Sequence, residues 1–342
     1  MSSLGSKGGA YIPPHRRRQQ APKIATQKFS PSRIRKLNDR SDGNESADKD
    51  LEVLCGAFDR VRCINLKRRQ DRWTAFCSRL TSTLGERGRK FVHQVERFDA
   101  VDGAALLASE TCTDDTTLLE WDATKNSMYD RHIQPPMKKY LTPGEVGCTM
   151  SHVQLWREIK NSEDSSYKML ILEDDATFYR GKQPKKLNRG GRPETGRSGG
   201  RGGDRHKPGF IEAFSRLWSL LPSDWHIVYL GFSDRGERIP VRALSAVEKN
   251  NGPLEVDVFQ PTYGFHTHAY ALSASAAEIL VSNLPVVGPL DVWLADNEWF
   301  GLNVYCAVVA NEGWNNQGAN LISQRRHDTK SDICPSGRAE GE

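Results

Sequence analysis

Three consecutive carboxylates, Glu173, Asp174 and Asp175, are the residues of this sequence best suited to chemistry. They follow a short apolar run, residues 169–172, which is long enough for a strand buried on both faces and too short for a helix. Such a strand places them at the carboxyl edge of a sheet, where open α/β sheets bind ligands. Three adjacent negative charges need a positive partner, and a hard divalent cation that bridges carboxylate and phosphate oxygens would supply it. An acidic turn facing solvent is the alternative for the tripeptide alone.

Two further groups of polar residues stand at predicted strand ends. A strand over residues 61–66 leads into a helix, and Arg68, Arg69 and Arg72 fall at the junction, where free backbone N–H groups favour an anion. These arginines predict a diphosphate site, with a solvated arginine cluster as the alternative. A second strand-like run, Phe91 to Gly103, ends in acidic residues. Asp102 there is suited either to hold a ribose or base edge or simply to form a turn.

Residues 141–159 predict a helix with a defined start. Thr142 is the N-cap, Pro143 takes the first helical position, and Glu145 completes a capping box. Glu145, Cys148 and His152 recur at spacings of three, four and seven, so they share one helix face beside the apolar stripe. Either this face contributes to a site, or Glu145 only caps the helix and His152 is a hydrogen-bonded core histidine.

The C-terminal part adds one more carboxylate of interest. Asp291, with Asp296 after it, lies in an apolar and aromatic setting, where an isolated carboxylate is costly and often functional. His266 and His268 would point to the same side of a strand. Without a third spaced ligand we interpret this pair as ordinary polar positions rather than a metal site.

The remaining pattern predicts an α/β domain. A helix over 210–221 precedes a buried strand over 224–232, and an alternating strand over 266–273 precedes a short helix that Ser275 and Glu278 would cap. A last strand or edge hairpin is expected at 304–310.

Charge and composition divide the chain. The net charge of the 342 residues is +5, but residues 1–50 carry +6 and residues 180–209 carry +8, so the remainder carries −9. An acidic body with basic appendages argues against a globule built to grip nucleic acid. We expect a disordered basic tail over 1–52, a catalytic domain over 53–330 with a disordered Gly/Arg-rich insertion at 180–209, and a C-terminal tail over 331–342.

Seven scattered cysteines without a CxxC pair suit reduced thiols. Neither a signal peptide nor a transmembrane segment is visible, which favours the cytoplasm.

Six blocks, taken in order, resemble glycosyltransferase family 25, which includes lipopolysaccharide and lipooligosaccharide enzymes and collagen galactosyltransferase-like proteins. The blocks are INLKRRQDRW, RFDAVDG, LTPGEVGCTMSH, LILEDDATF, DWHIVYLGF and HTHAYALSASAAEILVSNLPVVGPLD, and they extend from about Val61 to about Asp296. The resemblance implies the GT-A fold, with one Rossmann-like central sheet. It also implies a UDP-sugar donor, a hexose such as galactose or glucose, Mn²⁺ or Mg²⁺, and transfer with inversion to a glycan or protein acceptor.

The resemblance also assigns residues by position. The acidic motif of the family falls on Glu173, Asp174 and Asp175, which would hold the metal. Residues expected to contact the nucleotide-sugar are Asn65, Arg68, Arg72, Asp102, Gly103, Glu145, Ser151, His152 and Asp174. Inversion needs a carboxylate that takes the proton of the acceptor hydroxyl, and Asp291 is the candidate, with Asp175 as the second catalytic carboxylate. Asp291 would serve equally as a further metal ligand.

Two other function classes compete with this prediction. A degenerate transferase fold would bind RNA or protein through its basic Gly/Arg-rich segments, with weak and salt-sensitive affinity for nucleic acid. A nucleotide-sugar hydrolase or phosphotransferase would use an acidic pair after a strand in a similar way. The clustered carboxylates argue against the first class. A comparison of sugar transfer to an acceptor hydroxyl with sugar transfer to water distinguishes the second class from a glycosyltransferase.

Overall fold

A computed structural model describes residues 43–110, 113, 115–122, 138–181, 208–234, 236–241, 254–295, 300–310 and 318–324. Most of the expected tail and insertion, the C-terminal tail and Asp296 therefore lie outside the described residues. The expected tail does end earlier than predicted, because helix α1 (Gly43–Gly56) occupies its last ten positions. Leu54 is 1% exposed and packs with Leu51 and Val53 against the core, which explains why this segment is helical.

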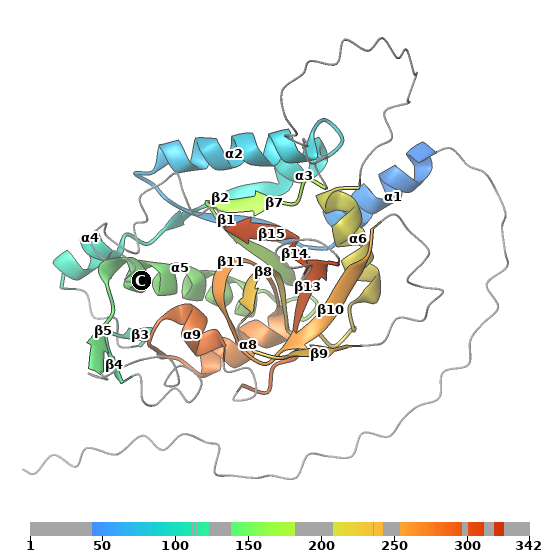
Figure 1. The fold of residues 1–342 in the computed structure, drawn as a ribbon. Helices are drawn as coiled ribbons and strands as arrows, with labels where there is room; N and C mark the ends of the chain where they lie inside the picture. Colours follow the sequence, from blue (N-terminus) through green and yellow to red (C-terminus); the bar gives the residue numbers. More distant parts are fainter. Residues whose placement is uncertain are drawn as a thin grey trace, which may run out of the picture. The chain divides into compact units, whose positions relative to one another are not determined.

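The described elements alternate between strands and helices (Figure 1). The helices after α1 are α2 (Gln70–Leu84), α3 (Arg89–Gln94), α4 (Gly103–Ala108), α5 (Pro143–Lys160), α6 (Phe210–Leu220), α8 (Ala274–Ser282) and α9 (Leu290–Leu294). The strands of the main sheet are β1 (Arg60–Leu66), β2 (Val95–Ala100), β6 (Lys168–Glu173), β8 (Ile227–Asp234), β9 (Arg238–Pro240), β10 (Val256–Pro261), β11 (Gly264–Ser273), β13 (Val304–Val309) and β14 (Ala319–Asn320). Three small pairs are formed by β3 (Thr117–Leu118) with β12 (Val286–Val287), β4 (Glu120–Asp122) with β5 (Lys138–Tyr140), and β7 (Ala176–Phe178) with β15 (Ile322–Gln324).

The main sheet is mixed, with the strand order β2-β1-β6-β11-β8-β13-β10-β9 and β14 beside β13. Strands β2, β1 and β6 are parallel, β11 is antiparallel to both β6 and β8, and β13 is parallel to β8. Among β2, β1, β6, β11, β8 and β13, five strands therefore point the same way and β11 is reversed. Strands β10 and β14, which are antiparallel to β13, are also reversed. The carboxyl ends of the five parallel strands share an edge, as in Rossmann-like sheets, and the fold is compatible with that class.

Alternate residues of each strand enter two separate cores. Leu170 and Leu172 of β6 contribute to the core under α1, α2, α3 and α6, whereas Met169 and Ile171 contribute to the core under α5, α8 and α9. The helices accordingly lie on the two faces of the sheet (Figure 1). A continuous apolar run such as residues 169–172 is what burial on both faces requires, so the prediction of this strand is confirmed.

Several predicted boundaries are confirmed and two are wrong. The capping box of Thr142 and Glu145 starts α5 as predicted. Residues 91–94 belong to α3 rather than to a strand, because Phe91 is fully buried beneath that helix. The strand expected at residues 304–310 is present as β13, but it lies inside the sheet between β8 and β10 rather than at an edge. The N-cap of α8 is Ser273, which accepts a hydrogen bond from the Ala276 N–H, two positions before the predicted cap.

None of the described helices combines the length and the apolar character that crossing a membrane requires.

Candidate active site at the carboxyl edge of the sheet

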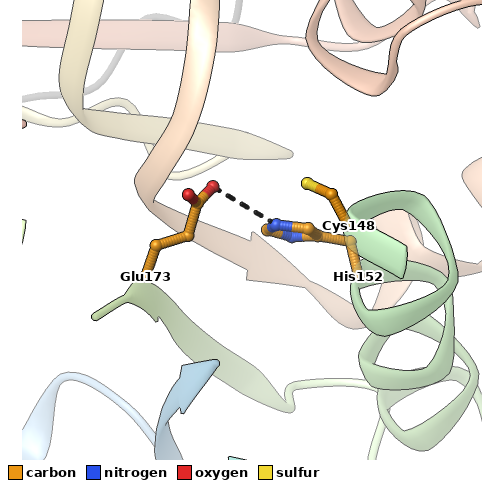
Figure 2. A group of neighbouring side chains, drawn as sticks. All are labelled: Cys148, His152 and Glu173. Carbon is orange, nitrogen blue, oxygen red and sulfur yellow. Dashed lines mark ion pairs between the residues drawn. The ribbon is translucent and has the colours of Figure 1, made fainter. Parts of the chain in front are cut away.

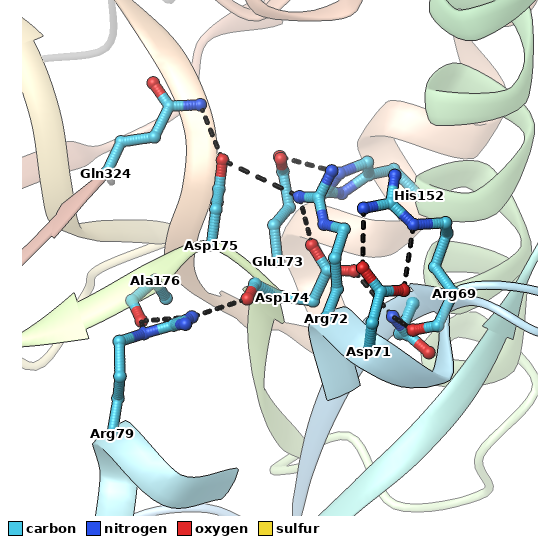
Figure 3. Close-up of polar contacts among 11 residues, drawn as sticks. Arg69, Asp71, Arg72, Arg79, His152, Glu173, Asp174, Asp175, Ala176 and Gln324 are labelled. Carbon is cyan, nitrogen blue, oxygen red and sulfur yellow. Dashed lines mark hydrogen bonds and ion pairs between the residues drawn. The ribbon is translucent and has the colours of Figure 1, made fainter. Parts of the chain in front are cut away.

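Residues from five elements meet where β1 and β6 end. Ile64 of β1 pairs with Glu173 of β6, so Asn65 and Asp174 follow at the same level of the edge. The reversed strand β11 begins at this edge, and α5 and α9 approach from one face. Figure 3 shows the side chains that gather around the acidic turn. The structure thus brings together carboxylates that stand more than a hundred residues apart in the sequence.

Asp174 is the centre of a polar network. One carboxylate oxygen accepts a hydrogen bond of 2.6 Å from Asn65 Nδ2. The other oxygen forms an ion pair with Arg72 (Figure 3). The backbone carbonyl of Asp174 also accepts a hydrogen bond from Arg79 Nη2 at 2.6 Å. The Asp174 side chain is 7% exposed, and this burial raises its pKa while Arg72 opposes the rise. Each oxygen of Asp174 thus has a partner within the protein, and its predicted role as a metal ligand remains a prediction.

The other arginines that were predicted to bind an anion at this edge also form pairs with carboxylates. Arg68 Nε donates to Asp102 Oδ2 at 2.7 Å, and Arg69 forms an ion pair with Asp71. The hydrogen bond from Arg68 lowers the pKa of Asp102, which also caps α4 by accepting from two backbone N–H groups. A diphosphate at these arginines would have to compete with carboxylates already present.

The close packing of two helices explains why residue 103 is a glycine. A Cβ atom at this position would lie 1.8 Å from the Pro143 carbonyl oxygen, so α4 and α5 approach each other in a way that only glycine permits. Ser151 has a similar structural task, since its hydroxyl donates to the Gly147 carbonyl at 2.6 Å and accepts from the Val101 N–H. Glu145 completes its capping box by accepting from the Thr142 N–H. These three residues support the edge, and their predicted contact with the nucleotide remains a prediction.

Glu173 is held from the α5 side of the turn. Thr267 Oγ1 donates to Glu173 Oε1 at 2.8 Å. His152 Nε2 lies 3.5 Å from the same oxygen (Figures 2 and 3). Burial raises the pKa of Glu173. The interaction with His152, through a hydrogen bond and its charge, and the hydrogen bond from Thr267 outweigh burial and hold that pKa at about 2. Glu173 is therefore a carboxylate at neutral pH.

Asp175 has one oxygen that the described residues leave unsatisfied. Gln324 Nε2 donates to Oδ2 at 3.0 Å, whereas Oδ1 is buried and has no hydrogen-bond partner in the described part of the chain. Burial, together with the negative charge of Glu173, raises the pKa of Asp175 to about 7. A buried carboxylate oxygen without a donor is the kind of atom that a cation would satisfy.

Asp291 lies at the start of α9 and completes the site. Its Oδ2 accepts from the His266 N–H at 3.2 Å, and its Oδ1 accepts from the Val292 N–H at 2.9 Å. Burial raises the pKa of Asp291, and the charge of Glu173 contributes in the same direction. His266 has a φ of +80°, a conformation that a residue other than glycine rarely adopts, and it directs its N–H to Asp291.

Two ligand sets here could hold a metal ion. The oxygens of Glu173 and Asp175 suit a hard cation such as Mn²⁺ or Mg²⁺. Cys148, His152 and Glu173 also lie close enough, with ligand atoms within 4.8 Å of one another, and Cys148 and His152 follow at one helix turn on α5 (Figure 2). A thiol and an imidazole are the softer set and suit Zn²⁺.

Sequence reasoning missed the residues that reach the site from a distance. Thr267 and Gln324 contact Glu173 and Asp175 from β11 and β15, and Arg79 reaches the turn from α2. The alternation of β11 gives a weak signal for Thr267. Nothing in the local sequence indicates that β15 pairs with β7 beside the acidic turn.

A carboxylate cluster at the carboxyl edge of a Rossmann-like sheet is typical of enzymes that bind nucleotides or phosphorylated ligands. Residues 59–188 match the family model of glycosyltransferase family 25 (LPS biosynthesis protein), which confirms the resemblance predicted from the sequence blocks. This part of the chain is a glycosyltransferase family 25 segment.

Named relatives agree with the family match. The chain is 27% identical over 231 residues to procollagen galactosyltransferase 2 of Mus musculus, an overlap of 67% of this chain and 28% of the relative. It is 35% identical over 239 residues to procollagen galactosyltransferase 1 of Danio rerio, an overlap of 69% and 30%. A glycosyltransferase 25 family member of Drosophila melanogaster is 32% identical over 122 residues, 36% of this chain and 17% of the relative. The chain thus spans less than a third of the length of these relatives.

Proposed function

We propose that this chain is a glycosyltransferase that transfers a hexose from a UDP-sugar to a hydroxyl of a glycan or protein acceptor, with inversion and with a divalent metal ion. The similarity to procollagen galactosyltransferases favours galactose over glucose as the hexose. The observation that carries the proposal is the pair Glu173 and Asp175, two carboxylates at the carboxyl edge of the sheet, one of which keeps a buried oxygen without a donor among the described residues.

The residues divide the work in the following way. Glu173 and Asp175 would hold the metal ion, while Asp174 is occupied by Asn65 and Arg72 and fixes the turn that carries them. When bound, the ion would neutralise negative charge on the diphosphate of the donor. Arg72 reaches to 4.0 Å from Asp175 and adds positive charge close to the leaving group.

Asp291 is proposed as the general base. Its carboxylate takes the proton of the acceptor hydroxyl as the acceptor oxygen bonds to the anomeric carbon. The bond from that carbon to the phosphate oxygen breaks on the opposite face, and UDP leaves with the electron pair, so the configuration inverts. Two backbone N–H groups hold Asp291 in place, and burial raises its pKa toward the range of a base that works near neutral pH.

The test is the thermal stability of the purified chain against UDP-sugars, UDP and GDP-sugars, each with and without Mn²⁺. A ligand at about a hundredfold over its dissociation constant stabilises by roughly 2.7 kcal/mol, which a melting curve resolves. We expect a shift with one UDP-sugar that requires Mn²⁺, and sugar transfer to an acceptor hydroxyl that exceeds transfer to water. No shift with any nucleotide would contradict the proposed function.

The variant Asp175→Asn sharpens this test. It keeps the size of the side chain but removes the charge, so we expect the Mn²⁺-dependent shift and the turnover to disappear while the protein remains folded. Retained turnover in this variant would show that the metal site has been assigned to the wrong carboxylate.

A further inference from the structure

Two donors compete for the same oxygen of Asp175. Gln324 Nε2 on β15 lies 3.0 Å from Asp175 Oδ2, and Arg72 Nη2 on α2 lies 4.0 Å from that oxygen. The two side chains reach the carboxylate from opposite sides (Figure 3). The first distance is that of an ordinary hydrogen bond, and the second is too long for one. Asp175 is therefore held by a neutral amide although a guanidinium lies close by.

This arrangement is the opposite of what the strengths of the two interactions favour. A pair of arginine and carboxylate is charged on both sides and can be bidentate, which makes it stronger than a hydrogen bond from a neutral amide. The side chains of Arg72 and Asp175 are 13% and 14% exposed, so solvent screens their attraction only weakly. Arg72 already pairs with Asp174, but its fork of five N–H donors can serve a second carboxylate. The rest of the fold must therefore impose the contact with Gln324.

The backbone of β15 is fixed firmly enough to impose this contact. Leu321 and Ile322 are both 0% exposed and belong to the core under α1, α2, α3 and α6. The Tyr179 N–H donates to the Leu321 carbonyl at 2.9 Å, and β15 pairs with β7. A Cβ atom on Gly231 of β8 would clash with the Ile322 carbonyl oxygen, so the glycine lets β15 approach β8 closely. These contacts hold the strand that carries Gln324.

We propose that Gln324 is a positioning residue of the transfer reaction, which holds Asp175 away from Arg72 and so keeps its carboxylate available to a divalent cation. The hydrogen bond to Oδ2 leaves Oδ1 for the ligand, and Oδ1 is the buried oxygen without a partner among the described residues. Without Gln324, Asp175 would join Asp174 on Arg72. The proposal rests on the proposed function for the identity of the ligand, a divalent cation with a nucleoside diphosphate.

This role makes β15 a part of the site. Residues 59–188 match the family model and contain both Asp175 and Arg72, whereas β15 lies beyond that match. The two opposite charges thus come from the matched segment, and the residue that separates them comes from outside it. Gln324 acts through Asp175 and not on the sugar or the nucleotide.

The direct test is a pair of crystal structures without metal or nucleotide, one of the wild-type chain and one of Gln324→Met. Methionine approximately keeps the length of the side chain and removes the N–H donor. We expect the Asp175 carboxylate of the variant to turn to Arg72 and form an ion pair at about 3 Å, in place of the 4.0 Å separation. An Asp175 that keeps its distance from Arg72 in the variant would overturn the proposal.

Metal affinity and stability distinguish positioning from a structural role. Partners in the second coordination shell are worth roughly 10–100-fold in metal affinity. We expect Gln324→Met to weaken binding of Mn²⁺ with UDP by about this factor, while turnover at saturating Mn²⁺ stays close to that of the wild type. In a chelator the melting temperature should not fall, because a new ion pair replaces the lost hydrogen bond. A lower melting temperature with unchanged Mn²⁺ affinity would show a structural role alone and overturn the proposal.

A double-variant cycle tests whether Arg72 is the competitor. Arg72→Lys keeps a positive charge for Asp174 but lacks the planar fork that would hold two carboxylates. We therefore expect Gln324→Met to lose less Mn²⁺ affinity in the Arg72→Lys background than in the wild type. Equal losses in the two backgrounds would mean that Gln324 does not act by holding Asp175 off Arg72.

Ser323→Ala is the control for the strand itself. Ser323 is the exposed neighbour of Gln324 on β15, so we expect this variant to bind Mn²⁺ with UDP as the wild type does. A loss equal to that of Gln324→Met would assign the effect to the strand and overturn the role of the amide. If the wild-type chain binds neither Mn²⁺ nor UDP while Asp175 turns to Arg72 in Gln324→Met, the proposed function fails and the positioning of Asp175 by Gln324 stands.

Discussion

Asp174 and Asp175 are consecutive in the chain but belong to two different electrostatic regions. The closed side of the turn consists of Asn65, Arg72, Arg79 and Asp174, in which both oxygens of the carboxylate are engaged. The open side consists of Glu173, Asp175 and Asp291, in which backbone and neutral side chains provide most of the donors and one buried oxygen has none among the described residues. The turn separates a region that supports the structure from a region that can accept a ligand.

The difference shows how a cluster of like charges is made stable. On the closed side Arg72, whose side chain is 13% exposed, supplies the compensating charge from within the protein. On the open side compensation is incomplete, and the pKa of Asp175 rises to about 7 because burial and Glu173 both favour its protonated form. A cation would complete the open side in the way that Arg72 completes the closed side.

The largest expected effect tests the open side at Asp291. We expect Asp291→Asn to lower turnover by roughly 10²–10⁴-fold with little change in affinity for UDP and Mn²⁺, because the amide cannot accept the hydroxyl proton. Steady-state rates and calorimetric titration of UDP with Mn²⁺ would measure the two quantities. Turnover in the wild type should also rise with pH as Asp291 loses its proton.

A suitable control is Asp224→Asn, because Asp224 lies before β8 at the opposite edge of the sheet, where it binds Asn303. Its turnover should equal that of the wild type. If Asp291→Asn lost affinity for Mn²⁺ instead of turnover, Asp291 would be a metal ligand rather than the base.

The next effect tests the closed side. Removing one partner of a buried ion pair costs about 3–5 kcal/mol, because the remaining charge is left uncompensated. We expect Asp174→Asn to lower the free energy of unfolding by about this amount, at the low end because Arg72 also lies 4.0 Å from Asp175 and can turn toward it. Denaturant titration measures the change.

Asp71→Asn provides the comparison for this variant. Asp71 pairs with Arg69 at the surface, with 64% of its side chain exposed, so we expect little change in stability. Similar losses in the two variants would mean that the closed side is no more than a surface cluster. A small loss at Asp174 with a large loss of Mn²⁺ affinity would instead move Asp174 to the metal site.

The strands that carry the site were predictable because their signals are local. The run at 169–172 and the capping box at Thr142 each contain their own evidence, burial on both faces in the first and side-chain capping in the second. The boundary of α1 was missed because its sequence is polar overall and its helix depends on Leu54 packing against a distant core. The interior place of residues 304–309 depends on strand order, which no segment encodes by itself.

The residues of the site were predictable from the sequence, but their division into a closed side and an open side was not. Adjacent carboxylates after a strand indicate a cation, but their partners come from β1, β11 and β15. Gly103 and Ser151 were assigned to the nucleotide by family position, whereas the structure also gives each a packing or hydrogen-bonding reason. Such reasons arise from the approach of α4 to α5 and leave no periodic signal in the sequence.

The smallest expected effect is a pH dependence of the free energy of unfolding, which distinguishes the open side from the closed side. Asp175 has a pKa of about 7 in the folded protein, above the ordinary aspartate value of 3.8, so its protonated form favours the folded state. Its stabilisation is complete below about pH 4 and is lost as the pH rises through 7. In a chelator, we expect Asp175→Asn to match the wild type at pH 4 and to exceed it by about 2–4 kcal/mol at pH 8. Mn²⁺ with UDP should reverse the order at pH 8, because the charged carboxylate then has its cation. A difference between the two proteins that does not vary with pH would place Asp175 on the closed side with Asp174.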